Sequence, residues 1–418
     1  MALGEEIALD TLEPADHLIH EPTDLGEVAA DRRDLRAEAV LQCVAETARE
    51  ARFELRCRRC EGFHLLARTL ERGVDRGGLD PPRGCLIDAR LGALDCVGIH
   101  RAQRYGGDRM DLGELDYELP AELIAQRPAE RRDDSRLLVY ERASGGVRHR
   151  RFSELPDELH GELVVVNDTR VVPARIPIEQ PRGEVLLLER VTDDEWVGLA
   201  RPTRRLRAGT RYGPVELLEH LGEGRWRLRL AGEPAGETPL PPYITTPLDD
   251  PERYQTVYAR AAGSAAAPTA GLHFTDELLG ALDVERVTLH VGLDTFRPVT
   301  EERLEEHVIH GERYEVAPAA WERIAAAERV LAVGTTTVRT LETVARGGAL
   351  VGRTELFITP GFAFKRVDAL LTNFHLPRST LLALVMAFAG VEETRQLYAL
   401  AVAERYRFYS FGDAMLIL

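Results

Sequence analysis

The sequence predicts a mixed α/β (α+β) protein: a larger domain of mixed sheet and helices, with a smaller antiparallel β-barrel domain inserted into it. After Met110, apolar runs of strand length alternate with segments of helical periodicity. Between about residues 172 and 254 the pattern changes to short strands separated by turn residues, which is typical of a small antiparallel barrel. We therefore expect a main domain formed by residues 110–171 and 255–418 and an inserted domain formed by residues 172–254.

The first 109 residues differ from the rest of the chain. Arginine-rich and acid-rich stretches alternate there, and the apolar periodicity is weak. We interpret residues 1–109 as an N-terminal extension, either disordered or the product of a mis-assigned start, with Met110 as the physiological start. Cys57 and Cys60 form a CxxC pair, but no second pair stands at a fixed spacing, so we favour an incidental pair over a zinc site.

In the main domain, strands are expected where short apolar runs are rich in β-branched residues. These runs are residues 137–140, 163–166, 287–291, 330–333, 356–359 and 414–418. Helices are expected from amphipathic spacing at residues 121–126, 336–346, 379–389, with Ser379 as N-cap, and 392–405. In the inserted domain, strands are expected at residues 184–190, 196–200, 215–219 and 226–230.

Composition excludes several functional classes. All five cysteines lie at or before Cys96, so thiolate nucleophiles, cysteine-bound metals and iron–sulfur clusters are excluded from most of the chain. A net charge of −16 argues against a protein that coats nucleic acid nonspecifically, although a local basic patch can still bind RNA. The chain has no apolar run of membrane-spanning length, and its first residues are acidic, so we expect a cytoplasmic protein.

The segment VGTTTVRTLE is the clearest candidate binding site. An apolar strand runs into Gly334, three threonines follow (Thr335, Thr336 and Thr337), and a helix begins there. Unpaired N–H groups and hydroxyls would converge at this point and hold an anion, with Arg339 one turn into the helix. An ordinary helix cap, in which the threonines satisfy the backbone, is an equally good interpretation.

Three histidines are candidates for proton transfer. GSAAAPTAGLHFT combines small residues, including Gly271, with His273 between two apolar neighbours, and His290 and His375 occur in comparable segments. A structural histidine is the more frequent outcome for each. His307, His310 and Glu312 match none of the common zinc spacings, so we expect no metal.

The segment RPTRRLR places four arginines in one predicted loop of an otherwise acidic chain. Clustered cations are sufficient to contact an RNA backbone, which makes Arg204 and Arg205 candidates for tRNA binding. The alternative is a solvated loop, as most charged runs are.

Nine segments, in this order, resemble the S-adenosylmethionine:tRNA ribosyltransferase-isomerase family of queuosine biosynthesis from about Met110 to the C-terminus. They are YELPAELIAQRPAERRDDSRLLV, NDTRVVPAR, RYQTVYA, GSAAAPTAGLHFT, TLHVGLDTFRPV, VGTTTVRTLE, LFITPGF, TNFHLPRSTLL and YRFYSFGDAMLI. The resemblance implies transfer and isomerisation of the ribosyl part of S-adenosylmethionine onto 7-aminomethyl-7-deazaguanine (preQ1) at the tRNA wobble position. Epoxyqueuosine-tRNA forms, and adenine and methionine are released.

The resemblance also implies partners and residue roles. S-adenosylmethionine is a co-substrate, no prosthetic group is needed, the other partner is tRNA, and the protein is expected to be a monomer. A base would begin the reaction by removing a proton beside the sulfonium, and His273 and His290 are both candidates. Arg170, Arg175 and the hydroxyls of Thr335 to Thr337 would stabilise negative charge that develops on the ring oxygens and on the departing adenine. Asn373 and His375 could recognise the deazaguanine or the adenine.

Some positions depart from the family pattern. Asp168 stands where a second asparagine is frequent, and Asp294 replaces a customary glycine. The competing interpretations are a non-catalytic RNA-binding protein and another S-adenosylmethionine-dependent tRNA-modifying enzyme. A methyltransferase would normally show a glycine-rich turn directly after its first strand, and none follows residues 137–140.

Overall fold

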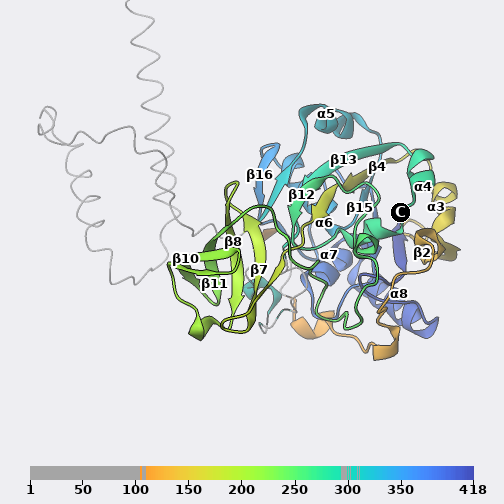
Figure 1. Ribbon diagram of the computed structural model, residues 1–418. Helices are drawn as coiled ribbons and strands as arrows, with labels where there is room; N and C mark the ends of the chain where they lie inside the picture. The colour runs from red at the N-terminus through yellow and green to blue at the C-terminus, as the bar shows by residue number, and fades with distance from the viewer. Residues whose placement is uncertain are drawn as a thin grey trace, which may run out of the picture. The chain divides into compact units, whose positions relative to one another are not determined.

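The structure is a computed structural model that describes residues 104–105, 110–292, 299, 301, 303–307, 309 and 311–418 (Figure 1). All of these residues lie in Asp95–Leu418, one of the two units into which the chain divides. Several expectations fall outside the described residues, namely those on the cysteines, on Asp294 and on His310.

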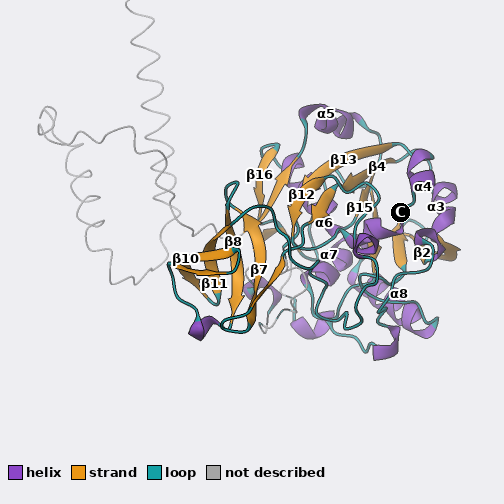
Figure 2. Cartoon of the chain, viewed as in Figure 1, coloured by secondary structure: helices purple, strands orange, loops and turns teal. Residues whose placement is uncertain are grey.

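A nine-stranded mixed sheet forms the main body (Figure 2). Its strand order is β16-β14-β13-β4-β15-β18-β19-β2-β3. In that order the strands are Val351–Thr354, Glu312–Glu315, Val284–Leu289, Leu163–Asn167, Val330–Val333, Ala369–Asn373, Ala414–Ile417, Arg136–Glu141 and Gly146–Arg151. The four strands from β13 to β18 are parallel to one another. The predicted strands at residues 137–140, 163–166, 330–333 and 414–418 are confirmed to within a residue or two. The strand predicted at 287–291 begins three residues and ends two residues earlier.

The central strands are buried on both faces, which explains their unbroken apolar runs. In β4, Val165 packs into one hydrophobic cluster, whereas Val164 and Val166 pack into another on the opposite face. Helices α5 (Pro318–Ala326), α6 (Thr335–Ala345), α7 (Thr380–Ala389) and α8 (Val391–Ala403) contribute to the first cluster. Helices α3 (Leu155–Glu158) and α4 (Asp276–Gly280) contribute to the second.

The predicted helix at residues 121–126 is wrong. A three-residue 3₁₀ helix, Ala121–Leu123, occupies the start of this segment, and Ile124 then pairs with Phe408. Pro128 follows closely and disfavours helical backbone in the residue before it. The other short 3₁₀ helices are Leu112–Leu115, Arg132–Asp134, Phe152–Glu154, Thr203–Arg205, Pro251–Tyr254, Thr269–His273 and Leu304–Glu306. Helices α6, α7 and α8 match their predicted ranges closely, and Ser379 caps α7 by accepting a hydrogen bond from Leu382 N at 3.2 Å.

A second sheet is antiparallel and has its own core. Its order is β6-β7-β8-β11-β10-β9, comprising Arg175–Ile178, Gly183–Arg190, Glu195–Arg201, Arg225–Leu230, Val215–Gly222 and Thr210–Tyr212. Trp196 and Trp226 are among the buried residues of this core. The predicted strands are present, but the outermost strands β6 and β9 do not pair with each other, so this sheet of the described residues is open and not a closed barrel. Strands β6 and β9 have only four and three residues, so they offer few backbone N–H and C=O groups for the hydrogen bonds that would close a barrel.

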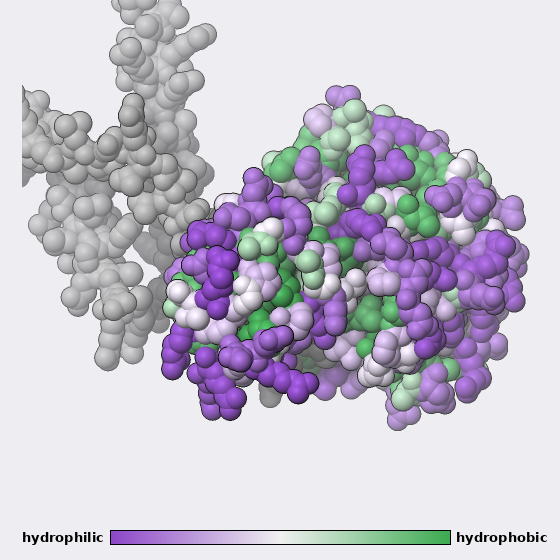
Figure 3. Space-filling view, in the orientation of Figure 1, coloured by the Kyte–Doolittle hydropathy of each residue, from purple (hydrophilic) through white to green (hydrophobic). Residues whose placement is uncertain are grey.

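Two small parallel pairs complete the strand arrangement. Strand β5 (Thr169–Val171) pairs with β12 (Ala261–Ser264), next to the end of β4. Strand β1 (Arg104–Tyr105), from the segment interpreted as an extension, pairs with β17 (Phe357–Ile358). Hydrophilic residues cover most of the visible face, with apolar residues in separate smaller patches (Figure 3). Among the described residues no helix is long and apolar enough to cross a membrane.

Candidate active site

A pocket of about 870 Å³ lies between the open antiparallel sheet and the nine-stranded sheet. One wall comes from β7 and β8, through residues that include Glu189 and Val197. The other walls come from the ends of β12, β13 and β14 and from α6, β17 and α7. This volume lies in the range of small-molecule sites.

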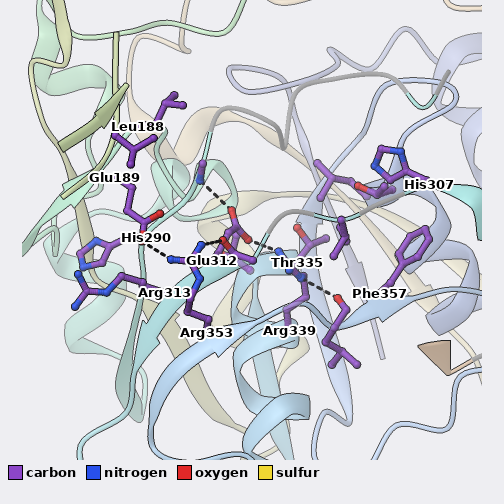
Figure 4. Close-up of a pocket in the computed structure, with 18 of the residues that line it drawn as sticks. Leu188, Glu189, His290, His307, Glu312, Arg313, Thr335, Arg339, Arg353 and Phe357 are labelled. Atoms are coloured by element: carbon purple, nitrogen blue, oxygen red, sulfur yellow. Dashed lines mark hydrogen bonds and ion pairs between the residues drawn. The ribbon is translucent and has the colours of Figure 1, made fainter. Parts of the chain in front are cut away.

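Five of the nine segments singled out in the sequence meet at this pocket. GSAAAPTAGLHFT contributes Gly263, TLHVGLDTFRPV contributes His290, and VGTTTVRTLE contributes the start of α6. LFITPGF and TNFHLPRSTLL contribute Phe357 and Thr380. Figure 4 shows His290, Glu189 and Arg313 on one side, and His307 with Phe357 on the other, with Thr335 and Arg339 between them. Residues from segments almost 120 positions apart therefore line one cavity.

The start of α6 opens into the pocket. Gly334 precedes the helix at φ +86°, a backbone conformation that favours glycine, and no side chain caps the helix there. Thr335 and Thr336 line the pocket, whereas Thr337 is fully buried and donates from Oγ1 to Val333 O at 2.7 Å. Uncapped N–H groups at a helix start attract anions. The binding interpretation therefore fits Thr335 and Thr336, whereas the hydroxyl of Thr337 serves the backbone carbonyl of Val333 and does not cap the helix.

Arg339 is committed to the protein. Its guanidinium pairs with Glu312 and donates to Leu356 O and Thr354 O, each at 3.1 Å. Glu312 also accepts from Gly292 N at 2.9 Å, and both charged side chains are buried. A buried charge is tolerated when it is paired and hydrogen-bonded, as here. Arg339 lines the pocket, but its guanidinium joins α6 to β14 and to the residues around Thr354 and does not present an open cation.

His290 follows β13 and lines the pocket. Its Nδ1 lies 3.0 Å from Thr169 Oγ1, and Nε2 has no hydrogen-bond partner among the described residues. Burial lowers the pKa of His290, and the nearby Arg313 lowers it further, against the opposing carboxylates of Asp168, Glu315 and Glu189. The imidazole is therefore neutral near pH 7 and is able to accept a proton.

His273 lies elsewhere, in the core on the other face of the sheet. Its Nδ1 is 3.0 Å from Ser135 Oγ and its Nε2 is 3.1 Å from Asn373 Nδ2, so both ring nitrogens are occupied. The ring packs against Phe152. Burial, with Arg407 and Arg132 adding to it, lowers the pKa of His273 to about 3. The adjoining cavity measures only about 10 Å³, enough for a single water.

Asn373 and His375 are also buried among protein groups. Asn373 accepts from Thr269 Oγ1 at 2.9 Å, and His375 Nε2 lies 2.8 Å from Thr372 Oγ1. Burial lowers the pKa of His375 to about 3. Neither residue lines the large pocket. The structure therefore does not bring these two candidates together with His290.

Three further candidates lie away from the pocket. Arg170 pairs with Glu252 at 2.6 Å, and Arg175 lies 3.8 Å from Glu184. A side chain at Gly271 would place its Cβ 1.9 Å from the Tyr258 hydroxyl, so packing alone requires a glycine there. None of the three lines the pocket.

Arg204 and Arg205 lie in the 3₁₀ helix Thr203–Arg205 that follows β8, and both are exposed. Neither side chain forms an ion pair with any other described residue. Their cations are therefore available to an external polyanion.

Sequence reasoning missed the groups that join the two sheets at the pocket rim. Glu189 on β7 pairs with Arg353 on β16, and Arg313 donates to Arg190 O at 3.2 Å. These partners are more than 120 residues apart, and neither side of either pair belongs to a recognisable motif. His307 lies 3.0 Å from Glu301, and no group of three or more metal-ligating side chains occurs among the described residues.

Comparisons with known proteins cover the same part of the chain. A family model described as "Queuosine biosynthesis protein" matches residues 112–417. The S-adenosylmethionine:tRNA ribosyltransferase-isomerase of Rubrobacter xylanophilus is 55% identical over 329 residues, which is 74% of this chain and 98% of that protein. The protein of the same name from Moorella thermoacetica is 52% identical over 344 residues, or 74% of this chain and all of that one. The crystal structure of the S-adenosylmethionine tRNA ribosyltransferase from Thermotoga maritima is 39% identical, covers 73% of this chain and 100% of that chain, and has a TM-score of 0.44.

Proposed function

The chain belongs to the queuosine biosynthesis protein family, and from this premise we propose how its pocket carries out the reaction of an S-adenosylmethionine:tRNA ribosyltransferase-isomerase. The enzyme transfers the ribosyl part of S-adenosylmethionine to tRNA and isomerises it, and it uses S-adenosylmethionine as a co-substrate. The observation that carries the proposal is the convergence of five family segments on one pocket.

The acceptor in this proposal is 7-aminomethyl-7-deazaguanine at the tRNA wobble position. Its amine takes the ribosyl carbon, the ring is rearranged to an epoxycyclopentanediol, and adenine and methionine leave. Because the substrate is a tRNA, we place the reaction in the cytoplasm, and we propose that the enzyme acts as a monomer.

We place the methionine carboxylate of S-adenosylmethionine at the start of α6. Thr335 and Thr336 line the pocket, no side chain caps the helix there, and the helix dipole favours an anion at that end. Phe357, Leu381 and Leu384 line an apolar part of the same pocket, which suits the flat face of adenine. Gly334 shapes the turn that exposes the helix end.

His290 is the candidate base that the geometry favours. The positive sulfonium acidifies the hydrogens on the adjacent ribose carbon, so a neutral imidazole in contact with the substrate is sufficient to remove one. His290 lines the pocket and has Nε2 available, whereas His273 lies in the core with both nitrogens occupied. Arg313, which also lines the pocket, is the cation that we propose to meet developing negative charge.

The tRNA backbone is proposed to contact the exposed loop that carries Arg204 and Arg205. This loop follows β8, which contributes Val197 to one wall of the pocket, and this shared strand supports a tRNA contact there. Phosphate contacts of this type position a nucleic acid without reading its sequence.

The test uses the full chain with S-adenosylmethionine and with tRNA that does or does not carry the aminomethyl base. Release of adenine is followed by chromatography, and the modified nucleoside is identified by mass. Adenine and epoxyqueuosine are expected only with the modified tRNA. Release of S-adenosylhomocysteine with a methylated tRNA would instead identify a methyltransferase and contradict the proposal.

A further inference from the structure

We propose that Thr169 is a positioning residue that fixes the tautomer of His290, keeping the proton on Nδ1 and leaving Nε2 as the basic nitrogen of the ring. The inference deepens the proposed function and rests on it, because it concerns how the proposed base is prepared.

Thr169 Oγ1 lies 3.0 Å from His290 Nδ1 and donates to Ala261 O at 3.3 Å. A threonine hydroxyl has one proton and two lone pairs, and a carbonyl can only accept. Both contacts are satisfied together only if the hydroxyl proton points to Ala261 O. Nδ1 must then donate its own proton to Oγ1, which assigns the tautomer of the ring.

The backbone around the ring keeps this contact in place. Thr169 on β5 is the direct partner of Ala261 on β12, so the hydroxyl and its acceptor carbonyl belong to one strand pair. The ring lies against Gly263, where a Cβ would be 3.0 Å from His290 Cε1. Gly263 also has φ +140°, which favours glycine. The absence of a side chain at this position of β12 leaves room for the imidazole to pack against the backbone.

The neighbouring carboxylate is engaged by other groups. Asp168 Oδ1 accepts from Thr288 Oγ1 at 2.6 Å, and Oδ2 lies 2.7 Å from Arg260. Thr169 is thus the hydrogen-bond partner of Nδ1, and it is neutral. A carboxylate in that place would fix the same tautomer but would also make the ring more basic. Of the charged groups around the ring, Arg313 lowers the pKa of His290, and Asp168, Glu315 and Glu189 raise it.

The first experiment measures the tautomer directly. The full chain is labelled with ¹⁵N-histidine, and the imidazole nitrogens of His290 are assigned by comparison with H290N. The proton is expected on Nδ1 near pH 7. A wild-type spectrum with the proton on Nε2 would overturn the proposal without any variant of Thr169.

The second experiment compares T169V with T169S. Valine keeps the shape of this fully buried side chain and removes the hydroxyl, whereas serine keeps the hydroxyl. T169V is expected to populate the Nε2–H tautomer and to lower kcat about 10-fold, the loss expected for one hydrogen bond, with KM unchanged. T169S is expected to behave like the wild type in both measurements. Equal losses in the two variants, or an unchanged tautomer in T169V, would overturn the proposal.

The experiments distinguish failure of the proposed role of His290 as the base from failure of its positioning by Thr169. If T169V shifts the tautomer while kcat stays at the wild-type value, the contact is as described but His290 is not the base, so the proposed role of His290 fails. If H290N abolishes turnover while T169V leaves the tautomer unchanged, His290 keeps its role and the positioning by Thr169 fails.

Discussion

Two histidines from family segments lie in two different regions of this protein, and those regions differ in their access to the pocket. His290 borders an open pocket, with one ring nitrogen held by Thr169 and the other available. His273 lies in the core, with Ser135 and Asn373 on its two nitrogens. Both have a lowered pKa, so protonation state alone does not separate them. Access to a substrate does separate them, because His290 lines the pocket and His273 does not.

The largest expected effect comes from replacing His290. In H290N, the amide can still donate to Thr169 in place of Nδ1, but the basic Nε2 is lost. We expect kcat for adenine release to fall about 10²–10⁴-fold, the usual contribution of a general base, with little change in stability.

The matched control for this comparison is H273Q. Measured per folded molecule, its kcat should remain within a few-fold of wild type, since His273 does not line the pocket. A larger loss of kcat in H273Q than in H290N would reverse the assignment of the two regions.

The next largest effect is expected from replacing Arg339, which lines the pocket but stabilises the fold through its ion pair with Glu312. R339M leaves Glu312 buried without its partner, and breaking such a pair costs about 3–5 kcal/mol in the free energy of unfolding. Denaturant titration measures this cost. The double variant R339M/E312M should recover part of it, because no unpaired charge then remains. If R339M unfolds at the wild-type denaturant concentration, the pair is not the structural link that we describe.

A smaller effect is expected in the pH dependence of stability in the His273 region. The folded pKa of about 3 lies below the unfolded value of about 6.5, so between these values only the unfolded chain binds the proton. His273 therefore contributes stability above pH 6.5 that is lost as the pH falls toward 3. Per pH unit in this window, this contribution is about 1.4 kcal/mol.

Denaturant titrations from pH 7 to pH 4 test this expectation. H273Q should flatten the pH dependence of the unfolding free energy by about one proton, and H375Q should do the same for the second buried histidine. H160Q, at an exposed histidine, is the matched control. An unchanged slope in H273Q would show that the His273 region is more open to solvent than described.

The smallest effect is expected at the exposed loop of the open sheet that carries Arg204 and Arg205. R204A/R205A should weaken tRNA binding a few-fold and reduce its salt dependence, with similar losses for modified and unmodified tRNA. Binding of S-adenosylmethionine alone should stay unchanged. Filter binding over a range of salt concentrations measures both quantities, and R182A/R211A on the same sheet provides a charge-matched control. Equal losses in the two double variants would remove the special role of this loop.

Much of the fold could be predicted because its signals are local. The strand containing Val164, Val165 and Val166 is apolar at every position, which indicates burial on both faces. Ser379 marks a helix start by its capping chemistry. The segment at residues 121–126 was misassigned because its apolar residues serve a tertiary contact, Ile124 with Phe408, instead of a helix face.

The sequence by itself determined the family, the alternation of strands and helices, and the set of segments from which the site is built. These three features depend on the order of the residues and can be predicted without knowledge of tertiary contacts. Only the tertiary structure decided which members of those segments face a ligand. Thr335 and Thr337 differ by two positions, yet one lines the pocket and the other bonds to Val333. The reason is that access and hydrogen-bond partners depend on groups far away in the chain, such as Thr169 beside His290 and Ser135 beside His273.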